Sequence, residues 1–402
     1  MKTINKQPKI RFKGYTDEWQ QRKLGELAEI VGGGTPSTKV SEYWNGNIDW
    51  YAPAEIGSKR YLKKSEKTIT ELGLKKSSAK LLPIGTVLFT SRAGIGNTAI
   101  LEKEGATNQG FQSIVPKNDI LDTYFIYSRT KELKRYGETT GAGSTFIEVS
   151  GKEMSKMNIN VPNIHEQQKI GSFFKQLDDT ITLHQRKLEA LEKIKKSFLQ
   201  KMFPKKDETK PEIRFAGFTD DWEQRKAIKI FTSISEKKHP ELPVLSASQE
   251  KGMILRDKIG IDIKYDKKSL NTYKKVSPGQ FVIHLRSFQG GFAYSEIEGI
   301  TSPAYTVIDF KDKELYYPLF WRFVLSSTTF IKKLETVTYG IRDGRSISFT
   351  DFSSLKFVVP GYEEQQKIGS FFKQLDDNIA LHQRQLEVLK NMKTSFLQKM
   401  YI

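Results

Sequence analysis

The 402-residue sequence contains no cysteine, so disulfide bonds and thiolate metal sites are excluded. Its five histidines are scattered along the chain, which argues against a transition-metal site. No stretch approaches the about 20 consecutive apolar residues that a membrane-spanning helix needs. The opening residues MKTINKQPKIRFKGY also lack the apolar core of a signal peptide. We therefore expect a cytoplasmic protein with no membrane partner.

Positive charge is in excess. There are 65 Lys and Arg residues against 47 Asp and Glu, which gives a formal net charge of +18. Such an excess attracts polyanions, because each phosphate that a cation neutralises releases condensed counterions. A lysine-rich solvated surface would give the same count, and charge alone does not separate the two. The basic residues are spread along the chain, which favours broad basic faces on folded domains over a disordered basic arm.

The chain contains an internal repeat. Residues 161–203 recur as 359–401 with a constant offset of 198, and 31 of these 43 positions are identical, including the run EQQKIGSFFKQLDD. A second pair, 8–23 and 211–226, matches at 11 of 16 positions. We therefore expect two tandem units, each with a preamble, a variable middle and a long ending. The predicted segments are 1–23 (preamble), 24–160 (first variable domain), 161–203 (first ending), 204–226 (linker and repeated preamble), 227–358 (second variable domain) and 359–402 (second ending).

The endings have the heptad pattern of a coiled coil. Eight of the ten a and d positions in the first copy are apolar, and the second copy repeats the pattern. Asn163 is a candidate N-cap with Glu166 three residues later, as in a capping box, and Pro204 would end the first helix. About 38 residues at about 1.5 Å each give a helix of roughly 57 Å. Two such helices in one chain would pair with each other, and we expect an antiparallel coiled coil with pseudo-two-fold symmetry.

Two polar residues occupy each predicted seam. His184 and His382 share an a position, where a polar residue fixes register and orientation more often than it binds a metal or takes part in catalysis. Lys195 and Lys393 share a d position, and they would either extend from the seam towards solvent or face a partner. We therefore interpret the two histidines as helix-register residues.

The variable middles have the alternating pattern of strands separated by turn residues, with a short helix near 122–136 and near 317–334. With an offset of 194, residues 85–114 and 279–308 share only 9 of 30 residues. Similar scaffolds with different surfaces suggest two readers of two different ligands. The predicted fold class is thus α+β, with two mixed α/β strand-rich domains joined by two long α-helices. The predicted strands are 86–90, 98–102 and 111–115 in the first domain and 280–285, 293–297 and 305–310 in the second.

Catalytic and cofactor motifs are missing. Residues 94–99 match G-x-G-x-x-A, but a dinucleotide site needs a following helix, and 98–111 has the pattern of another strand and turn. The glycines at 32–34 have no Gly-Lys-Ser/Thr behind them, so they do not form a P-loop. No Asn-Pro-Pro-Phe or Asp-Pro-Pro-Tyr tetrapeptide of an adenine methyltransferase is present. We predict no catalytic, cofactor-binding or metal-binding residue, although nuclease carboxylate clusters stay open.

The two-unit arrangement resembles the specificity subunits of type I restriction-modification enzymes. GELAEIVGGGTPSTKVSEYWNGNIDWYAP (25–53), LLPIGTVLFTSRAGIGNTAI (81–100) and ATNQGFQSIVP (106–116) resemble the target-recognition domain of that family. VPNIHEQQKIGSFFKQLDD (161–179) resembles its helical region. The resemblance covers essentially the whole chain. The second domain lacks the GGGTP and TNQGF segments, so its target does not transfer from the first.

The resemblance implies a non-catalytic, DNA-reading subunit. Each recognition domain would read one half of a split double-stranded DNA sequence, and the paired helices would set the distance between the halves. Two methyltransferase subunits would dock on the chain and methylate an adenine in each half with S-adenosylmethionine. Two restriction subunits would use ATP and Mg²⁺ to translocate and cleave unmethylated DNA. No cofactor would bind to this chain itself.

Loops rich in Arg, Lys, Asn, Gln, Ser and Thr are the candidate DNA contacts, because these side chains read base edges or hold phosphates. Solvated loops would have the same composition. Arg92 and Arg286 are the main pair, since identity between domains that read different bases indicates phosphate anchoring. The alternative is a structural arginine paired with Glu102 or Glu104 and their matches Glu296 or Glu298. The full set is Thr35, Ser37, Lys39, Ser91, Arg92, Asn108, Gln109, Ser144 and Thr145 in the first domain and Arg286, Ser287, Gln289, Arg342 and Arg345 in the second.

Two other classes of protein stay open from the sequence. A self-contained nuclease or methyltransferase would need about another domain of catalytic sequence, and all 402 residues are already assigned. A coiled-coil scaffold or RNA-binding protein would also fit the charge and the repeat.

Overall fold

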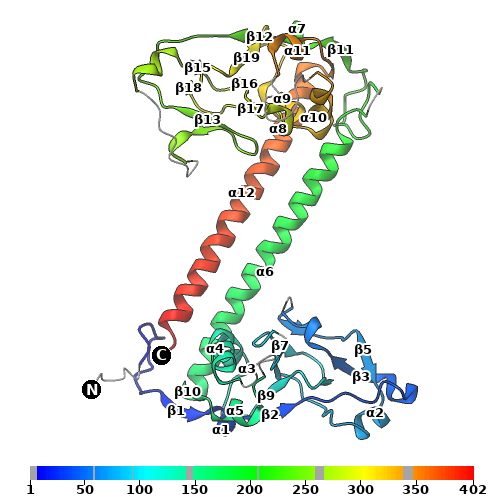
Figure 1. Cartoon of the computed structure of the whole chain (residues 1–402), viewed down its shortest axis with the longest axis vertical. Coiled ribbons are helices and arrows are strands. Elements are labelled where there is room, and N and C mark those ends of the chain that lie inside the picture. Colours follow the sequence, from blue (N-terminus) through cyan, green and yellow to red (C-terminus); the bar gives the residue numbers. More distant parts are fainter. Residues whose placement is uncertain are drawn as a thin grey trace. The chain divides into compact units, whose positions relative to one another are not determined.

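The computed structural model describes residues 7–57, 59–92, 94–141, 148–205, 208–258, 267–337 and 347–402. The chain divides into two compact units, which we call unit 1 (Met1–Gln185 with Arg384–Ile402) and unit 2 (Arg186–Gln383). Each unit combines one strand-rich domain with parts of two long helices, α6 (Ile164–Lys201) and α12 (Tyr362–Lys399) (Figure 1). Both long helices have 38 residues, as the heptads predicted.

Unit 1 contains a five-stranded sheet in the order β2-β9-β6-β7-β4 and a three-stranded sheet in the order β5-β3-β8. Strands β1 and β10 form a separate antiparallel pair. The strands are β1 (Gln20–Lys23), β2 (Ala28–Gly32), β3 (Trp44–Tyr51), β4 (Tyr61–Leu62), β5 (Lys67–Ile69), β6 (Val87–Phe89), β7 (Thr98–Leu101), β8 (Gly105–Thr107), β9 (Gln112–Pro116) and β10 (Asn158–Val161). The shorter helices are α1 (Leu24–Leu27), η1 (Ser41–Tyr43), η2 (Pro53–Glu55), α2 (Glu71–Lys75), α3 (Thr123–Ser128), α4 (Thr130–Thr140) and α5 (Gly151–Lys156).

Unit 2 contains a four-stranded sheet in the order β12-β19-β16-β17, with the pairs β11-β20, β13-β14 and β15-β18 beside it. The strands are β11 (Glu223–Lys226), β12 (Phe231–Ile234), β13 (Leu245–Ser248), β14 (Gly252–Leu255), β15 (Lys274–Val276), β16 (Phe281–Ile283), β17 (Ala293–Tyr294), β18 (Gly299–Thr301), β19 (Thr306–Phe310) and β20 (Lys356–Val359). The shorter helices are α7 (Ala227–Ile230), η3 (Arg256–Lys258), η4 (Lys267–Thr272), α8 (Ser287–Gly290), α9 (Pro318–Leu325), α10 (Thr328–Glu335) and α11 (Phe349–Ser353).

The two domains share a scaffold, as the offset of 194 predicted. Strands β6, β8 and β9 of unit 1 recur at this offset as β16, β18 and β19 of unit 2. Buried apolar side chains explain these strands, because β6 and β16 have no exposed residue. The predicted strand at 293–297 is shorter than expected, since β17 has only two residues.

The two predicted short helices are each two helices, which corrects the prediction. The helix near 122–136 is divided into α3 and α4 at Arg129, whose buried side chain bonds a carboxylate and a main-chain carbonyl of unit 1. The helix near 317–334 is divided into α9 and α10 before Ser327, whose hydroxyl accepts the N–H of Phe330 and caps α10. A capping serine thus interrupts the pattern in unit 2, and a buried arginine lies at the break in unit 1.

Within each unit the long helices run antiparallel, as predicted. In unit 1 the ring of Phe173 on α6 packs against Phe396 on α12, with ring centroids 5.1 Å apart. In unit 2 Phe198 on α6 packs in the same way against Phe371 on α12, at 5.2 Å. The preambles occupy matching places. The N–H of Ile10 donates to Lys399 at 2.9 Å in unit 1, and the N–H of Ile213 donates to Lys201 at 2.9 Å in unit 2.

The seam lysines Lys195 and Lys393, which we expected either to extend towards solvent or to face a partner, form ion pairs across the helices within each unit. Lys195 of α6 pairs with Asp376 of α12 at 2.5 Å, and Lys393 of α12 pairs with Asp178 of α6 at 2.5 Å. Both lysines are about a third exposed or less, and each charge is balanced across the helix pair. An acidic residue on the facing helix thus explains a polar residue at a seam position.

A buried ion pair attaches each preamble to the start of a long helix. Glu166 is fully buried and accepts two hydrogen bonds from Arg11, at 2.7 and 2.8 Å. Glu364 of unit 2 accepts the matching pair from Arg214, at 2.9 and 2.8 Å, and a further bond from Trp222. This bidentate geometry is the strongest that a carboxylate and a guanidinium form.

The predicted capping box is only half present. Asn163 caps α6 as expected, because its side chain accepts the N–H of Glu166 at 3.0 Å. The carboxylate of Glu166 does not return to the N-cap backbone, since Arg11 occupies both of its oxygens. Glu166 bonds Arg11 and not the main-chain N–H of Asn163, because a pair of charge-assisted bonds is stronger than one bond to a neutral N–H.

A buried glutamine fixes each domain to its helix. The side chain of Gln167 donates to the carbonyls of Ile120 and Pro162, at 3.0 and 2.9 Å, and accepts the N–H of Asp122 at 3.1 Å. Gln365 makes the three matching bonds in unit 2. These bonds satisfy main-chain groups on both the domain and the helix, so the junction is ordered in both units.

Glycine lets the helices approach the domains closely. A Cβ on Gly171 would lie 2.3 Å from an Asp122 carboxylate oxygen. A Cβ on Gly369 would lie 2.6 Å from the amide nitrogen of Phe320. No other residue fits at either position without a shift of its neighbours.

Candidate DNA interface

Three loops of unit 1 meet on its surface. A Cβ on Gly33 would lie 1.9 Å from the carbonyl oxygen of Asn108, so the loop after β2 lies directly against the loop after β8. The Thr35 hydroxyl donates to the side-chain carbonyl of Gln109. A Cβ on Gly110, which follows Gln109, would lie 3.6 Å from Nε of Arg92. The structure thus brings together Thr35, Arg92, Asn108 and Gln109, which the sequence had placed in three separate loops.

A group of lysines borders this cluster, and the sequence analysis missed it. A Cβ on Gly34 would lie 2.3 Å from atoms of the loop after α2, so that loop lies beside the segment with Ser37 and Lys39, which are both exposed. Lys75, Lys76 and Lys80 of this loop region are exposed as well, and within the described part of the chain they form no ion pair. The signal was the basic run KKSSAK, which contains no acidic residue.

Two of the candidate residues lie beneath the surface. Ser91 and Ser287 are fully buried. The N–H of Ser91 donates to Gly110 at 2.8 Å, and the hydroxyl of Ser287 accepts the N–H of His284 at 2.8 Å. These two serines therefore shape the turns that carry the neighbouring arginines, and their side chains do not face solvent.

In unit 2 the matching turn also exposes an arginine. Arg286 follows β16, and its N–H donates to Nδ1 of His284 at 3.2 Å. Burial lowers the pKa of His284 to about 4, and the nearby Arg286 charge acts in the same direction, so the imidazole stays neutral and accepts this bond at neutral pH. Gln289 is exposed and lies 3.4 Å from Gln249 of the β13-β14 turn, beside the exposed Lys251.

A small hollow lies between the β13-β14 turn and the end of α8. Its volume is about 60 Å³. The β13-β14 turn forms one wall with Gln249 and Lys251, and Arg322 and Glu296 form part of the rest. The hollow therefore lies next to the end of α8, beside the segment that carries Gln289.

The two arginines differ in their partners. Arg92 lies 3.8 Å from Glu148, and both side chains are more than a third exposed. Arg286 forms no ion pair with any residue that the structure describes. Three of the four carboxylates considered as structural partners are engaged elsewhere, with Glu102 on Lys63, Glu296 on Arg322 and Glu298 on Lys275. Among the described residues, the one ion pair of either arginine is thus the weak, exposed pair of Arg92 with Glu148.

The remaining candidates give less information. Ser144, Thr145, Arg342 and Arg345 lie outside the described residues. His184 and His382 are half-buried on α6 and α12, and their register role stays a prediction.

The glycine motif at 94–99 has a structural explanation. The segment is followed by strand β7 where a dinucleotide site would have a helix. A Cβ on Gly96 would lie 2.4 Å from Lys134 of α4, so this glycine permits close packing. Among the residues that the structure describes, no three potential metal ligands gather in one place. The described helices include none with the length and hydropathy to cross a membrane.

Comparison with known proteins identifies the family. A family model for the type I restriction modification DNA specificity domain matches residues 16–193 and again residues 219–391. The two matches together cover well over half of the chain. The chain belongs to this specificity-domain family. Members of the family are the non-catalytic DNA-recognition subunits of type I restriction-modification systems, as the sequence resemblance implied.

Individual specificity subunits match along the chain. The MjaIX specificity subunit of Methanocaldococcus jannaschii is 28% identical over 413 residues, which covers 95% of this chain and 92% of the relative. The EcoR124I/EcoR124II specificity subunit of Escherichia coli is 32% identical over 177 residues, which covers 42% of this chain and 43% of the relative.

The fold is also known from a crystal structure. The S subunit of the type I restriction-modification system from M. genitalium superposes with a TM-score of 0.63 at 14% identity, covering 98% of this chain and 99% of that one. The specificity subunit therefore shares its α+β fold with a relative over essentially the whole length.

Proposed function

We propose that this chain reads a split double-stranded DNA sequence, with one half read by each recognition domain (24–160 and 227–358). One observation carries the proposal. The groups at the start of each long helix (Glu166, Gln167 and Gly171, with their matches Glu364, Gln365 and Gly369) repeat with equivalent contacts, whereas the exposed loops at the candidate interface differ apart from the arginine pair. A common scaffold with two different polar surfaces suits two different half-sites.

The proposed contacts divide into two kinds. Arg92 and Arg286 anchor phosphates, because they are matched, Arg92 is partly exposed and Arg286 exposed, and they are weakly paired at most. Thr35, Gln109 and Gln289 present amide and hydroxyl groups that suit base edges in the major groove. The further exposed cations Lys39, Lys75, Lys76 and Lys80 add phosphate contacts in unit 1.

The long helices are proposed to set the spacer and to dock the methyltransferase subunits. Each helix exposes a matched set of residues between its start and the residue just past its midpoint. Leu183 is 52% exposed and its match Leu381 is 47% exposed, although both are apolar. Exposed residues that are identical in two places suit a partner that binds twice. The matched exposed set is Gln168, Gln176 and Leu183 on α6 and Gln366, Gln374 and Leu381 on α12.

The chemistry is assigned to the partner subunits. Two methyltransferase subunits would methylate an adenine in each half with S-adenosylmethionine. Two restriction subunits would use ATP and Mg²⁺ to cleave DNA that lacks the methyl groups. This chain would determine which DNA sequence is recognised and would contribute no catalytic group.

Methylated adenines mapped across the host genome, with and without the gene for this chain, test the proposal. We expect a split motif that disappears with the gene and returns with the intact chain. A continuous motif, or methylation by the purified chain alone with S-adenosylmethionine, would contradict it.

A further inference from the structure

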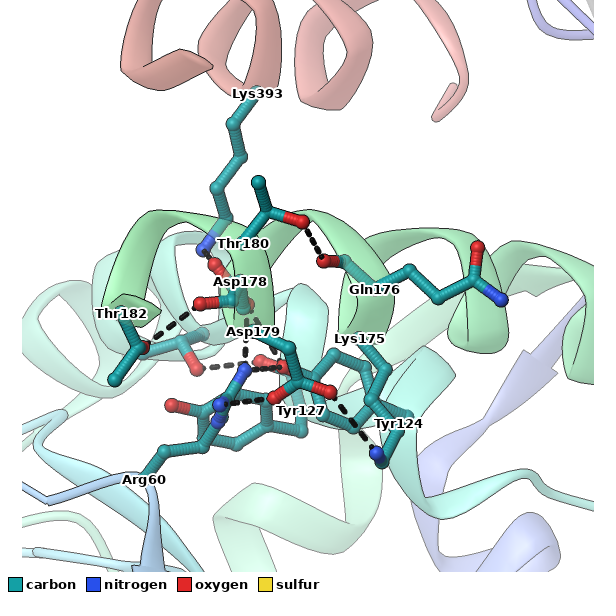
Figure 2. Close-up of polar contacts among 11 residues, drawn as sticks. Arg60, Tyr124, Tyr127, Lys175, Gln176, Asp178, Asp179, Thr180, Thr182 and Lys393 are labelled. Atoms are coloured by element: carbon teal, nitrogen blue, oxygen red, sulfur yellow. Dashed lines mark hydrogen bonds and ion pairs between the residues drawn. The ribbon is translucent and has the colours of Figure 1, made fainter. Parts of the chain in front are cut away.

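A charged cluster in unit 1 joins three elements (Figure 2). Asp178 of α6 is only 14% exposed, and its carboxylate accepts from Lys393 of α12 at 2.5 Å and from the Tyr124 hydroxyl of α3 at 2.8 Å. Arg60, from the segment before β4, lies 3.9 Å from the same carboxylate. One aspartate therefore contacts both long helices and the recognition domain.

Arg60 is the main link from the domain to this cluster. Its guanidinium donates to Asp179 of α6 at 2.5 Å and to the Tyr124 hydroxyl at 2.9 Å. Its main-chain carbonyl accepts the N–H of Ile100 on β7 at 2.8 Å, so the backbone of Arg60 is hydrogen-bonded to the five-stranded sheet. Burial raises the pKa of Tyr124, and the Asp178 charge raises it further, so the phenol remains a donor. The recognition domain is thus tied to α6 by an exposed bond from Arg60 to Asp179 and by part-buried bonds through the Tyr124 hydroxyl.

Unit 2 has the same helix groups and a different arginine. Asp376 of α12 accepts from Lys195 of α6 at 2.5 Å, which matches the pair of Asp178 with Lys393. Arg322 of α9 lies 3.9 Å from Asp376 and pairs with Glu296 at 2.7 Å. The domain of unit 2 therefore also places a guanidinium at the helix aspartate, at the same distance as in unit 1, but its close ion pair is with its own domain.

The two arginines come from positions that do not correspond. The matching bonds of Gln167 and Gln365 align Asp122 with Tyr317, so Arg322 corresponds to Tyr127 of unit 1. Arg60 precedes β4, and the four-stranded sheet of unit 2 has no strand in that place among the described residues. The two domains thus reach the same helix aspartate by independent routes.

The position of Asp178 along α6 determines how the Arg60 contact can act on the orientation of the domain. The glutamine junction attaches the domain at Gln167, and Asp178 lies 11 residues further along α6, about 16 Å away. Apolar packing around Ile170 and Phe174 and the close approach at Gly171 hold the domain along the first part of α6. The Arg60 contacts lie further along the helix, where they oppose a tilt of the domain about this packed region.

We infer that Arg60 and Arg322 are positioning residues that hold each recognition domain at one tilt on the long helices, and that they thereby restrict the spacer length that the chain accepts. This inference rests on the proposed function. A tilt that moves the reading loops by about 3.4 Å would shift the contact by one base-pair step. Arg60 has the closer contacts, so its loss has the larger effect.

The test compares Arg60→Ala, Arg60→Lys and wild type, each assembled with its methyltransferase subunits. The probes are synthetic duplexes that carry both half-sites mapped for the wild type, with the natural spacer or with one base pair more or fewer. We expect Arg60→Ala to reduce discrimination between spacers about tenfold, the size of losing one charge-assisted contact, with half-site preference unchanged. Arg60→Lys should discriminate between spacers less well than wild type and better than Arg60→Ala. Arg322→Ala should give a smaller loss.

Lys156→Ala is the matched control, because it removes an exposed ion pair with Glu153 in the same domain. Unchanged spacer discrimination in Arg60→Ala, with only a lower melting temperature, would overturn the inference. If Arg60→Ala does not fold, Tyr124→Phe removes one hydroxyl from the same cluster, and equal discrimination in that variant would overturn it as well. A wild type that methylates no split motif would overturn the proposed function itself, before any variant is compared.

Discussion

The attachment regions and the reading surfaces of the two units have diverged to different extents. Each helix start uses the same buried carboxylate, the same glutamine and the same close glycine, with equivalent partners in unit 1 and unit 2. The surface loops keep one matched arginine and little else. The identical run EQQKIGSFFKQLDD is therefore retained largely because its buried side chains connect domain to helix. The described loops carry more exposed side chains, so more of their positions can change without the loss of a buried contact.

The largest expected difference concerns the buried ion pairs. Arg11→Ala leaves Glu166 fully buried without its charged partner, which should cost about 3–5 kcal/mol. Arg214→Ala should cost less, because Glu364 keeps the bond from Trp222 at 3.1 Å. Urea unfolding of both variants measures the difference. Arg22→Ala, which breaks an exposed pair with Glu26, is the control and should change stability by no more than about 0.5 kcal/mol. Equal losses in the two arginine variants would show that Trp222 contributes nothing.

A smaller difference should appear in acid. Burial, with the nearby Arg286 charge, lowers the pKa of His284 from 6.5 to about 4 in the folded chain. The unfolded chain therefore binds a proton first, and stability that is present above pH 6.5 is lost as the pH falls towards 4, by up to about 1.4 kcal/mol per pH unit. Unit 1 has Thr90 at the matched position, so this acid sensitivity belongs to unit 2.

His284→Gln tests this assignment, because glutamine does not titrate. Melting temperatures of wild type and variant, measured from pH 7 to pH 4, should converge as the pH falls. A variant whose stability declines with the same slope as the wild type would place the acid-sensitive group elsewhere.

The smallest effect is expected at the DNA surface. Arg286→Ala should weaken binding to all sequences and reduce the slope of log affinity against log salt by about 0.9. Arg92→Ala should reduce it less, since Arg92 lies near Glu148 already. Neither change should alter which bases are preferred. Lys117→Ala is the control, because its ammonium group bonds main-chain carbonyls at Gly25 and Glu26. A lower melting temperature with a normal salt slope would identify either arginine as part of the scaffold.

Features with a repeating apolar pattern could be predicted from the sequence. The heptads gave the length and pairing of α6 and α12, because burial of residues such as Ile170 and Phe174 dominates the helix energetics. The strands β6 and β16 followed from short apolar runs between turn residues. The N-cap at Asn163 followed from local chemistry.

Long-range polar contacts could not be predicted in this way. The contact of Arg60 with Asp178 joins residues far apart in sequence, and neither belongs to a periodic pattern. The division of the helix at Arg129 involves a buried guanidinium that bonds the main-chain carbonyl of Asn160 on β10 as well as the nearby Glu132. At the candidate site, the sequence found Arg92 and Gln109 but gave no sign that Ser91 is buried. Its main chain pairs with a distant loop, and side-chain polarity alone does not report this.

Exchange of residues 24–160 for the first recognition domain of another family member tests most directly whether two independent readers share one scaffold. The chimera would be expressed with its methyltransferase subunits, and its methylated adenines would be mapped across the genome. The account predicts that one half of the motif is replaced by the donor's half and that the other half is unchanged. A change in both halves would contradict it.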